Sequence, residues 1–193
     1  MKISQWTRAA MTAVVAAGLA VGSVAAASPA HAAGGYKGKV IAKKGLVIRS
    51  APSSHAKATG SLEKGDKISL DCKANGPKVD GNGMWYELSN GKGWVTARYV
   101  DNIGAAPKLC PVADTEFGVG KTKSGVNMRS GPTTDDSIRG ALPKGTKVTV
   151  RCYVKSEKVG SHQLWYLLDN GSWVSAANVK RLDVPASNWV RCT

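Results

Sequence analysis

Hydrophobic and polar residues alternate with a period of two in several short segments of the chain. Residues 67–72 and 147–152 are the clearest examples, with apolar side chains at every second position and Lys, Ser, Asp, Thr or Arg between them. Residues 46–49 carry a shorter alternation. Successive side chains of a β-strand point to opposite faces, so this period is typical of strands with one buried face. No segment after residue 32 sustains helical spacing, and the pattern therefore predicts an all-β fold.

Glycine-containing dipeptides separate these expected strands. Asn-Gly occurs at residues 90–91 and 170–171, each time between a Trp-Tyr segment and a Trp-Val segment. Asn-Gly is favoured in the type I′ turn of a hairpin, whose central residues need positive φ angles. Lys-Gly at residues 64–65 and 144–145 marks a second tight turn. We expect about five short strands in each stretch of roughly 60 residues, which suits a small barrel closed on itself to hide its edges.

The second half of the chain repeats the first. Residues 45–52 (GLVIRSAP) return as residues 125–132 (GVNMRSGP), an offset of 80. The same offset relates the Trp-Tyr pairs, the Lys-Gly and Asn-Gly turns and one cysteine of each half, and a one-residue deletion then aligns the last Trp-Val pair. Matches in one register predict two copies of one module. We expect the first copy, with a linker, over residues 33–113 and the second over residues 114–193.

The first 32 residues have the features of an export signal. Lys2 and Arg8 supply positive charge, residues 11–24 are apolar, and residues 30–32 (Ala-His-Ala) form a small-x-small cleavage site. We therefore expect residues 1–32 to be a cleaved signal peptide. An uncleaved anchor is the alternative, which the short apolar run, dense in Ala and Gly, disfavours. No later stretch approaches the ~20 apolar residues of a membrane span, so no transmembrane anchor is expected.

All four cysteines lie in the expected exported part, where an even number predicts disulfides. Four cysteines allow three pairings, and the repeat symmetry selects Cys72 with Cys110 and Cys152 with Cys192, separated by 38 and 40 residues. A zinc site is the alternative, but no Cys-x-x-Cys spacing occurs. We therefore predict one disulfide in each copy and expect neither a metal nor another cofactor.

The ordered motifs resemble the bacterial SH3 domain family, SH3b. The motifs of the first copy are Arg49-Ser50-x-Pro52, Lys64-Gly65, Trp85-Tyr86, Gly93-Trp94-Val95 and Tyr99-Val100, and those of the second are Asn127-x-Arg129-Ser130-Gly131-Pro132, Lys144-Gly145, Trp165-Tyr166 and Trp173-Val174. The copies depart from the family pattern at Val47, Ala51, Ser172 and Asn178. The resemblance implies two SH3-like β-barrels in tandem. It also implies a ligand in the bacterial cell wall, either peptidoglycan or an associated polymer.

Charge favours an anionic partner. The formal net charge is +14, and loss of the signal peptide leaves +12. Residues 33–113 carry +7 and residues 114–193 carry +5, so neither half is a dedicated basic tail. Such an excess attracts polyanions by long-range attraction and counterion release, and outside a bacterial cell the polyanionic surface is the wall. Charge that serves only solubility is the alternative. Export disfavours nucleic acid as a partner.

Strand alternation predicts that Trp85 and Trp165 lie opposite the inward-facing Leu88 and Leu168. There the two indoles could form aromatic platforms beside the Arg-Ser-x-Pro loops, or they could be packing at the barrel end. The loop arginines could bind a ligand or brace their own loop. The candidate ligand-binding residues are Arg49, Ser50, Pro52 and Trp85 in the first copy and Arg129, Ser130, Pro132 and Trp165 in the second. Trp94 and Trp173 are expected in the core.

No constellation for catalysis is evident in the exported part. His55 and His162 fall in expected loops and are not repeated between the copies. The thiols are assigned to disulfides, and Asp135 and Asp136 are neighbours in a turn rather than carboxylates facing across a cleft. We therefore expect no enzyme and no catalytic residue.

The sequence thus predicts a secreted, non-catalytic, monomeric protein, extracellular or cell-wall associated. Its two SH3b modules would bind peptidoglycan or an anionic wall polymer, and binding by both copies would add avidity. The alternative is a protein-recognition module, a secreted inhibitor or adaptor that docks a protein partner through the barrel loops.

Overall fold

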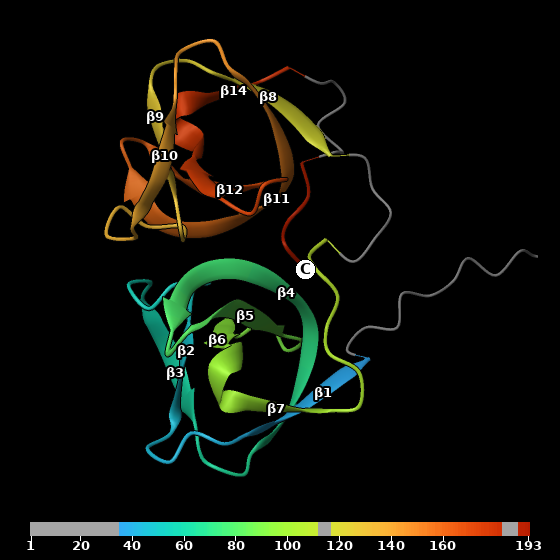
Figure 1. The fold of residues 1–193 in the computed structure, drawn as a ribbon. Coiled ribbons are helices and arrows are strands. Elements are labelled where there is room, and N and C mark those ends of the chain that lie inside the picture. The colour runs from blue at the N-terminus through green and yellow to red at the C-terminus, as the bar shows by residue number, and fades with distance from the viewer. Residues whose placement is uncertain (1–34, 112–116, 183–188) are drawn as a thin grey trace, which may run out of the picture. The chain divides into compact units, whose positions relative to one another are not determined.

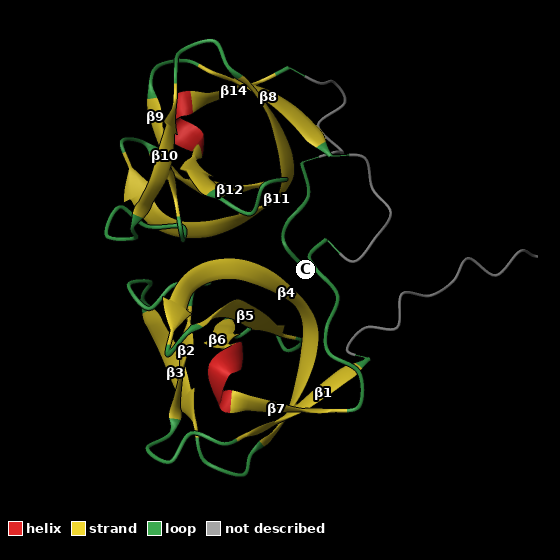
Figure 2. Cartoon of the chain, viewed as in Figure 1, coloured by secondary structure: helices red, strands yellow, loops and turns green. Residues whose placement is uncertain are grey.

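The structure is a computed structural model, which describes residues 35–111, 117–182 and 189–193. The expected signal peptide lies outside these residues. Figure 1 shows two curled β-sheets, one from each copy, and Figure 2 shows a short helix within each curl. No helix in the described part of the chain is long and apolar enough to span a membrane.

Seven strands and one 3-10 turn form the first copy. They are β1 (Tyr36–Val40), β2 (Leu46–Arg49), β3 (Ala58–Leu62), β4 (Lys67–Val79), β5 (Asn82–Leu88), β6 (Trp94–Thr96), η1 (Ala97–Tyr99) and β7 (Val100–Ile103). The sheet order is β3-β2-β6-β5-β4-β1-β7, with antiparallel pairing throughout. The long strand β4 pairs with β1 through its first residues and with β5 through the rest. Two register shifts along the β4–β5 pairing increase its twist and allow the sheet to curl (Figure 1).

The second copy has the same topology. Its elements are β8 (Gly118–Thr122), β9 (Val126–Arg129), β10 (Ile138–Leu142), β11 (Lys147–Val159), β12 (His162–Leu168), β13 (Trp173–Ser175), η2 (Ala176–Asn178) and β14 (Val179–Arg181). The order β10-β9-β13-β12-β11-β8-β14 repeats that of the first sheet. The all-β tandem fold is therefore confirmed. Each copy has seven strands rather than the expected five, and in each copy five of the seven are only three to five residues long.

The Asn-Gly turns differ from the expected type I′ geometry. Gly91 and Gly171 have φ angles of 70° and 77°, but no asparagine has a positive φ in the described residues. Instead, Asn90 Oδ1 accepts from Lys92 N at 3.0 Å, and Asn170 Oδ1 accepts from Ser172 N at 2.9 Å. The asparagine side chain thus mimics a turn hydrogen bond within a longer loop, and only the glycine needs the left-handed conformation. The tight turns at Gly65 and Gly145 have the expected positive φ, 98° and 87°.

Each copy has its own hydrophobic core and its own disulfide. Leu70, Tyr86 and Leu88 lie in the core of the first copy, together with Val95. Their counterparts Val150, Tyr166, Leu168 and Val174 lie in the core of the second. The disulfides are Cys72–Cys110 and Cys152–Cys192, as predicted from the repeat symmetry.

A third cluster of buried residues draws on both copies, which belong to one compact unit. From the first copy it contains Ala51, Ala56, Cys72, Ala74, Trp85, Trp94 and Cys110, and from the second Cys152, Val154, Trp165, Leu167, Trp173 and Cys192. Trp173 Nε1 donates a 2.8 Å hydrogen bond to the Asn75 carbonyl, and Arg151 Nε donates to the Cys110 carbonyl at 3.3 Å. The copies are therefore joined by packing as well as by the linker.

Candidate binding surfaces

The two candidate platform residues, Trp85 and Trp165, are buried, each only 2% exposed. They do lie opposite Leu88 and Leu168, which belong to the cores of the individual copies. However, the face that carries the indoles is covered by the disulfides and by the shared cluster. Their Nε1 groups donate to the Pro77 carbonyl at 3.1 Å and the Glu157 carbonyl at 2.9 Å. Of the two interpretations open from the sequence, packing therefore describes the indoles, and an exposed platform does not. Trp94 and Trp173 are buried as expected.

The loop arginines brace their own loops. Arg49 Nη1 donates to the Ala56 carbonyl at 3.0 Å. Arg129 Nη1 donates to the carbonyls of Thr134 and Asp136, at 2.7 and 2.8 Å. This bracing was one of the two interpretations open from the sequence. Since a guanidinium has five N–H donors, Nε and Nη2 of the partly buried Arg129 are not used by these contacts.

The other candidate loop residues differ in exposure. Pro52 and Pro132 are buried, and so is Ser130, whose Oγ has no hydrogen-bond partner in the described structure. Ser50 is partly exposed. It lines a cleft of about 500 Å³ together with His55, Ala56, Lys57, Thr133, Asp135, Lys155, Ser156, Glu157 and Gln163. Both charge signs are represented in this lining, so the cleft has no strong preference for an anion or a cation.

A buried carboxylate connects the two Arg-Ser-x-Pro loops, a contact that the sequence reasoning missed. Asp136 is 1% exposed and accepts from Thr133 N at 3.0 Å and Thr133 Oγ1 at 2.9 Å. It also accepts from Ser53 Oγ of the first copy at 2.8 Å, and His55 Nδ1 lies 3.1 Å from its Oδ1. Asp136 aligns with Ala56 of the first copy. An acid present in only one copy was the only sign in the sequence that this position has a role of its own. These contacts of Asp136 hold the two loops together.

A second buried carboxylate, Glu87, lies beside the first disulfide. It is 2% exposed, with Oε2 3.8 Å from Cys72 Sγ and Oε1 3.9 Å from Arg191 Nη2. Burial raises the pKa of Glu87 to about 8, against the smaller opposing effect of the Arg191 charge. Glu87, Cys72 and Cys110 form a compact group of potential metal-ligand types, but both sulfurs are committed to the disulfide.

One small pocket of the second copy brings together two of the candidate residues, Arg129 and Trp165. Its volume is about 190 Å³, and its lining consists of Gly125, Val126, Asn127, Arg129, Thr134, Val159, Trp165, Ser175 and Asn178. The pocket thus places the small exposed part of the Trp165 indole beside amide, hydroxyl and guanidinium groups. Asn178 is held by a 3.0 Å hydrogen bond from Ser124 Oγ to its Oδ1.

The first copy has Tyr99 at the position of Asn178. The Tyr99 hydroxyl donates to the Asp80 carboxylate, and this hydrogen bond raises the pKa of Tyr99. Asp80 aligns with Gly160 of the second copy, so the hydrogen bond between Tyr99 and Asp80 has no equivalent there. The two corresponding surfaces are therefore chemically different.

Comparison with known families identifies the module. The model of the bacterial SH3 domain matches residues 44–101 and again residues 124–180. The chain belongs to the bacterial SH3 domain family. Both SH3 domains include the Arg-Ser-x-Pro loop and the two Trp-containing strands. The domain limits at residues 33–113 and 114–193 stay a prediction.

Other comparisons add little to the family match. A solved structure named Endolysin LysPBC5 CBD is 14% identical to this tandem SH3 chain, with a TM-score of 0.29. That match covers 76% of this chain and 93% of the other. A search of curated proteins finds no match.

Proposed function

We propose that the chain is an exported, non-catalytic protein whose tandem SH3 domains bind peptidoglycan or an associated anionic polymer of the bacterial wall. The observation that carries the proposal is the match of the bacterial SH3 model to both copies. The formal net charge of +14 and the two disulfides fit a protein that works outside the cell, against a polyanionic surface.

The pocket of the second copy offers a place for the peptide part of peptidoglycan. Its 190 Å³ is below the roughly 300 Å³ of small pockets for whole ligands, so it suits a single amino-acid residue of a longer chain. Asn127 and Thr134 supply polar groups for a peptide backbone, and Trp165 supplies an apolar wall. The unused N–H groups of Arg129 suit a carboxylate. Of the candidate ligand-binding residues, Arg129 and Trp165 line this pocket, and we propose these two as its contacts to the ligand.

Sedimentation with purified sacculi tests the proposal. We expect the protein to sediment with intact sacculi, and to retain part of this binding when anionic polymers have been stripped from them. Rising salt should weaken the polymer-dependent part, because exposed charge contacts are screened. Absence of sedimentation under all of these conditions would overturn wall binding. A single stoichiometric protein captured from culture supernatant would then favour the protein-recognition alternative.

A further inference from the structure

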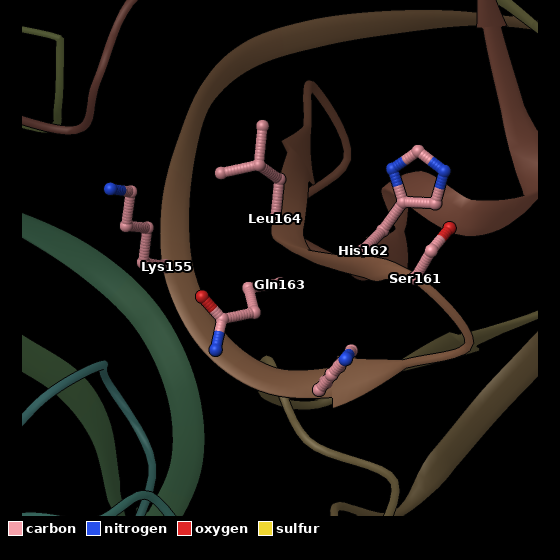
Figure 3. Close-up of a pocket in the computed structure, with 6 residues that line it drawn as sticks. Lys155, Ser161, His162, Gln163 and Leu164 are labelled. Atoms are coloured by element: carbon pink, nitrogen blue, oxygen red, sulfur yellow. The ribbon is translucent and has the colours of Figure 1, made fainter.

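The hairpin of β11 and β12 carries a second concavity in the second copy, shown in Figure 3. Its volume is about 490 Å³, and its lining consists of Lys155, Lys158, Ser161, His162, Gln163 and Leu164. In Figure 3 the labelled side chains spread along the hairpin, with the Lys155 amine at one end and the His162 ring at the other. The lining includes two ammonium groups and no carboxylate. It shares Lys155 and Gln163 with the cleft beside Ser50, whose lining also contains the acids Asp135 and Glu157.

The basic side chains of this concavity are exposed and unpaired in the described part of the chain. Lys155, Lys158 and His162 are exposed, and none of them has an ion pair or side-chain hydrogen bond within residues 35–111, 117–182 and 189–193. The nearest acid in sequence, Glu157, is occupied elsewhere. Its carboxylate accepts from Thr134 Oγ1 at 2.6 Å and from Thr134 N. Neither lysine therefore forms an ion pair in the described part of the chain.

The fold does not require these residues. At the aligned positions the first copy has Asn75 for Lys155, Asn82 for His162 and Gly83 for Gln163, and it keeps only Lys78 for Lys158. The aligned hairpin of β4 and β5 forms the same paired strands without them. At these positions the second lysine and the histidine thus occur in the second copy alone.

We propose that this concavity, which we call the hairpin anion site, binds the phosphodiester groups of a polyol-phosphate chain in the wall. Lys155 and Lys158 would neutralise phosphate charge, while Ser161, His162 and Gln163 donate hydrogen bonds to phosphate oxygens. Leu164 offers apolar surface to the carbon segments between phosphates. A volume of 490 Å³ has room for one or two repeats, in the usual range for small-ligand sites. The inference rests on the proposed wall binding and names the polymer part of it.

Binding of fluorescently labelled poly(glycerol phosphate), followed by anisotropy over a salt series, tests the site. The variant Lys155→Gln/Lys158→Gln should weaken binding about threefold to tenfold, since two exposed charge contacts are lost. The slope of log affinity against log salt should fall in magnitude by about 1.4, because each phosphate contact on a single chain contributes about 0.7. Exposed Lys to Gln changes leave folding nearly unaffected.

The matched control is Lys67→Gln/Lys78→Gln, which removes two exposed lysines from the equivalent strand β4 of the first copy. Both pairs of substitutions lower the net charge by the same amount. An equal loss of affinity in the two variants would overturn the hairpin anion site and indicate diffuse attraction. A loss confined to the Lys155/Lys158 variant supports it.

Two further measurements separate this site from its alternatives. Amide chemical shifts should move at residues 155–164 on addition of the polymer, and unchanged shifts there would overturn the site. Vesicles rich in phosphatidylglycerol present a phosphodiester on a lipid; binding to these vesicles without binding to the polymer would also overturn the proposal. Sacculi stripped of polymer should bind both double variants equally well. These experiments can therefore overturn the hairpin anion site without overturning the proposed binding to peptidoglycan.

Discussion

The two copies share their strand order but bury acidic residues at different places. The first copy buries Glu87 where the second has Leu167, and the second buries Asp136 where the first has Ala56. Asp136 is surrounded by hydrogen-bond donors, whereas Glu87 has one distant cation and a disulfide sulfur beside it. A buried carboxylate is stable as an anion only when donors replace its lost hydration. The two copies therefore accommodate a buried acid differently: several hydrogen-bond donors surround Asp136, whereas burial raises the pKa of Glu87.

The largest expected effect comes from the disulfides, at which the copies are most alike. Replacing both cysteines of either pair with alanine should lower the free energy of unfolding by about 4 kcal/mol, because each bond closes a loop of similar length. Denaturant unfolding with a common m-value measures this. A large loss from one pair and none from the other would show that the copies do not depend on their disulfides equally.

The next largest effect should come from Asp136→Ala, which gives the second copy the residue of the first. Ser53 Oγ, Thr133 N and Thr133 Oγ1 would lose their buried acceptor, at a cost of about 3 kcal/mol in the free energy of unfolding. The control is Asp135→Ala, at an exposed neighbouring position, with an expected change within about 0.5 kcal/mol. Equal stabilities of the two variants would contradict a structural role for Asp136.

The raised pKa of Glu87 predicts that the free energy of unfolding depends on pH through a residue of the first copy. Its pKa is raised from 4.5 to about 8, so the folded state holds a proton that the unfolded state releases. This contribution to stability is present below pH 4.5 and is lost as pH rises through about 8. Between these limits the free energy of unfolding should fall by roughly 1 kcal/mol per pH unit.

The variant Glu87→Gln mimics the protonated acid and should remove that slope. Thermal unfolding from pH 5 to pH 8.5 compares the two proteins, with Glu63→Gln as an exposed control that keeps the slope. Parallel profiles for the original protein and Glu87→Gln would show that Glu87 does not titrate in this range.

The smallest expected effect concerns the pocket at Arg129 and Trp165. Asn178→Tyr places the first copy's side chain beside this pocket and should weaken sedimentation with polymer-stripped sacculi about threefold, by occupying part of its volume. The reciprocal change, Tyr99→Asn, removes the hydrogen bond to Asp80 and should leave binding by the second copy unchanged. If Asn178→Tyr binds as well as the original protein, the pocket is not a peptide site.

Sequence patterns were sufficient where the structure depends on local periodicity or on symmetry between the copies. The strand pattern of residues 67–72 and 147–152 and the pairing of the four cysteines belong to this class. Alternation also assigned Trp85 and Trp165 to the correct side of their strands. It could not predict their burial, because what covers that side comes from residues far away in the chain.

Sequence patterns likewise did not predict the side-chain contacts between the two copies. Ser53 and Asp136 are 83 residues apart, and neither carries a motif that indicates a hydrogen bond between them. The type I′ prediction failed for a local reason, since the Asn90 and Asn170 side chains accept backbone hydrogen bonds and stabilise a different turn. For the Arg-Ser-x-Pro loops, the sequence leaves both ligand binding and bracing open to Arg49 and Arg129, because their acceptors are backbone carbonyls that carry no sequence signal.

The hydrogen bond from the Trp173 indole to the Asn75 carbonyl places an intrinsic fluorophore at the contact between the two copies. Trp85, Trp94, Trp165 and Trp173 lie in the cluster common to both copies, sheltered from solvent. Indole emission moves to longer wavelength when water reaches the ring, so parting of the copies would appear as a red shift without any attached dye. A fluorimeter can therefore follow, in a single titration with sacculi, whether engagement of the wall leaves this cluster closed.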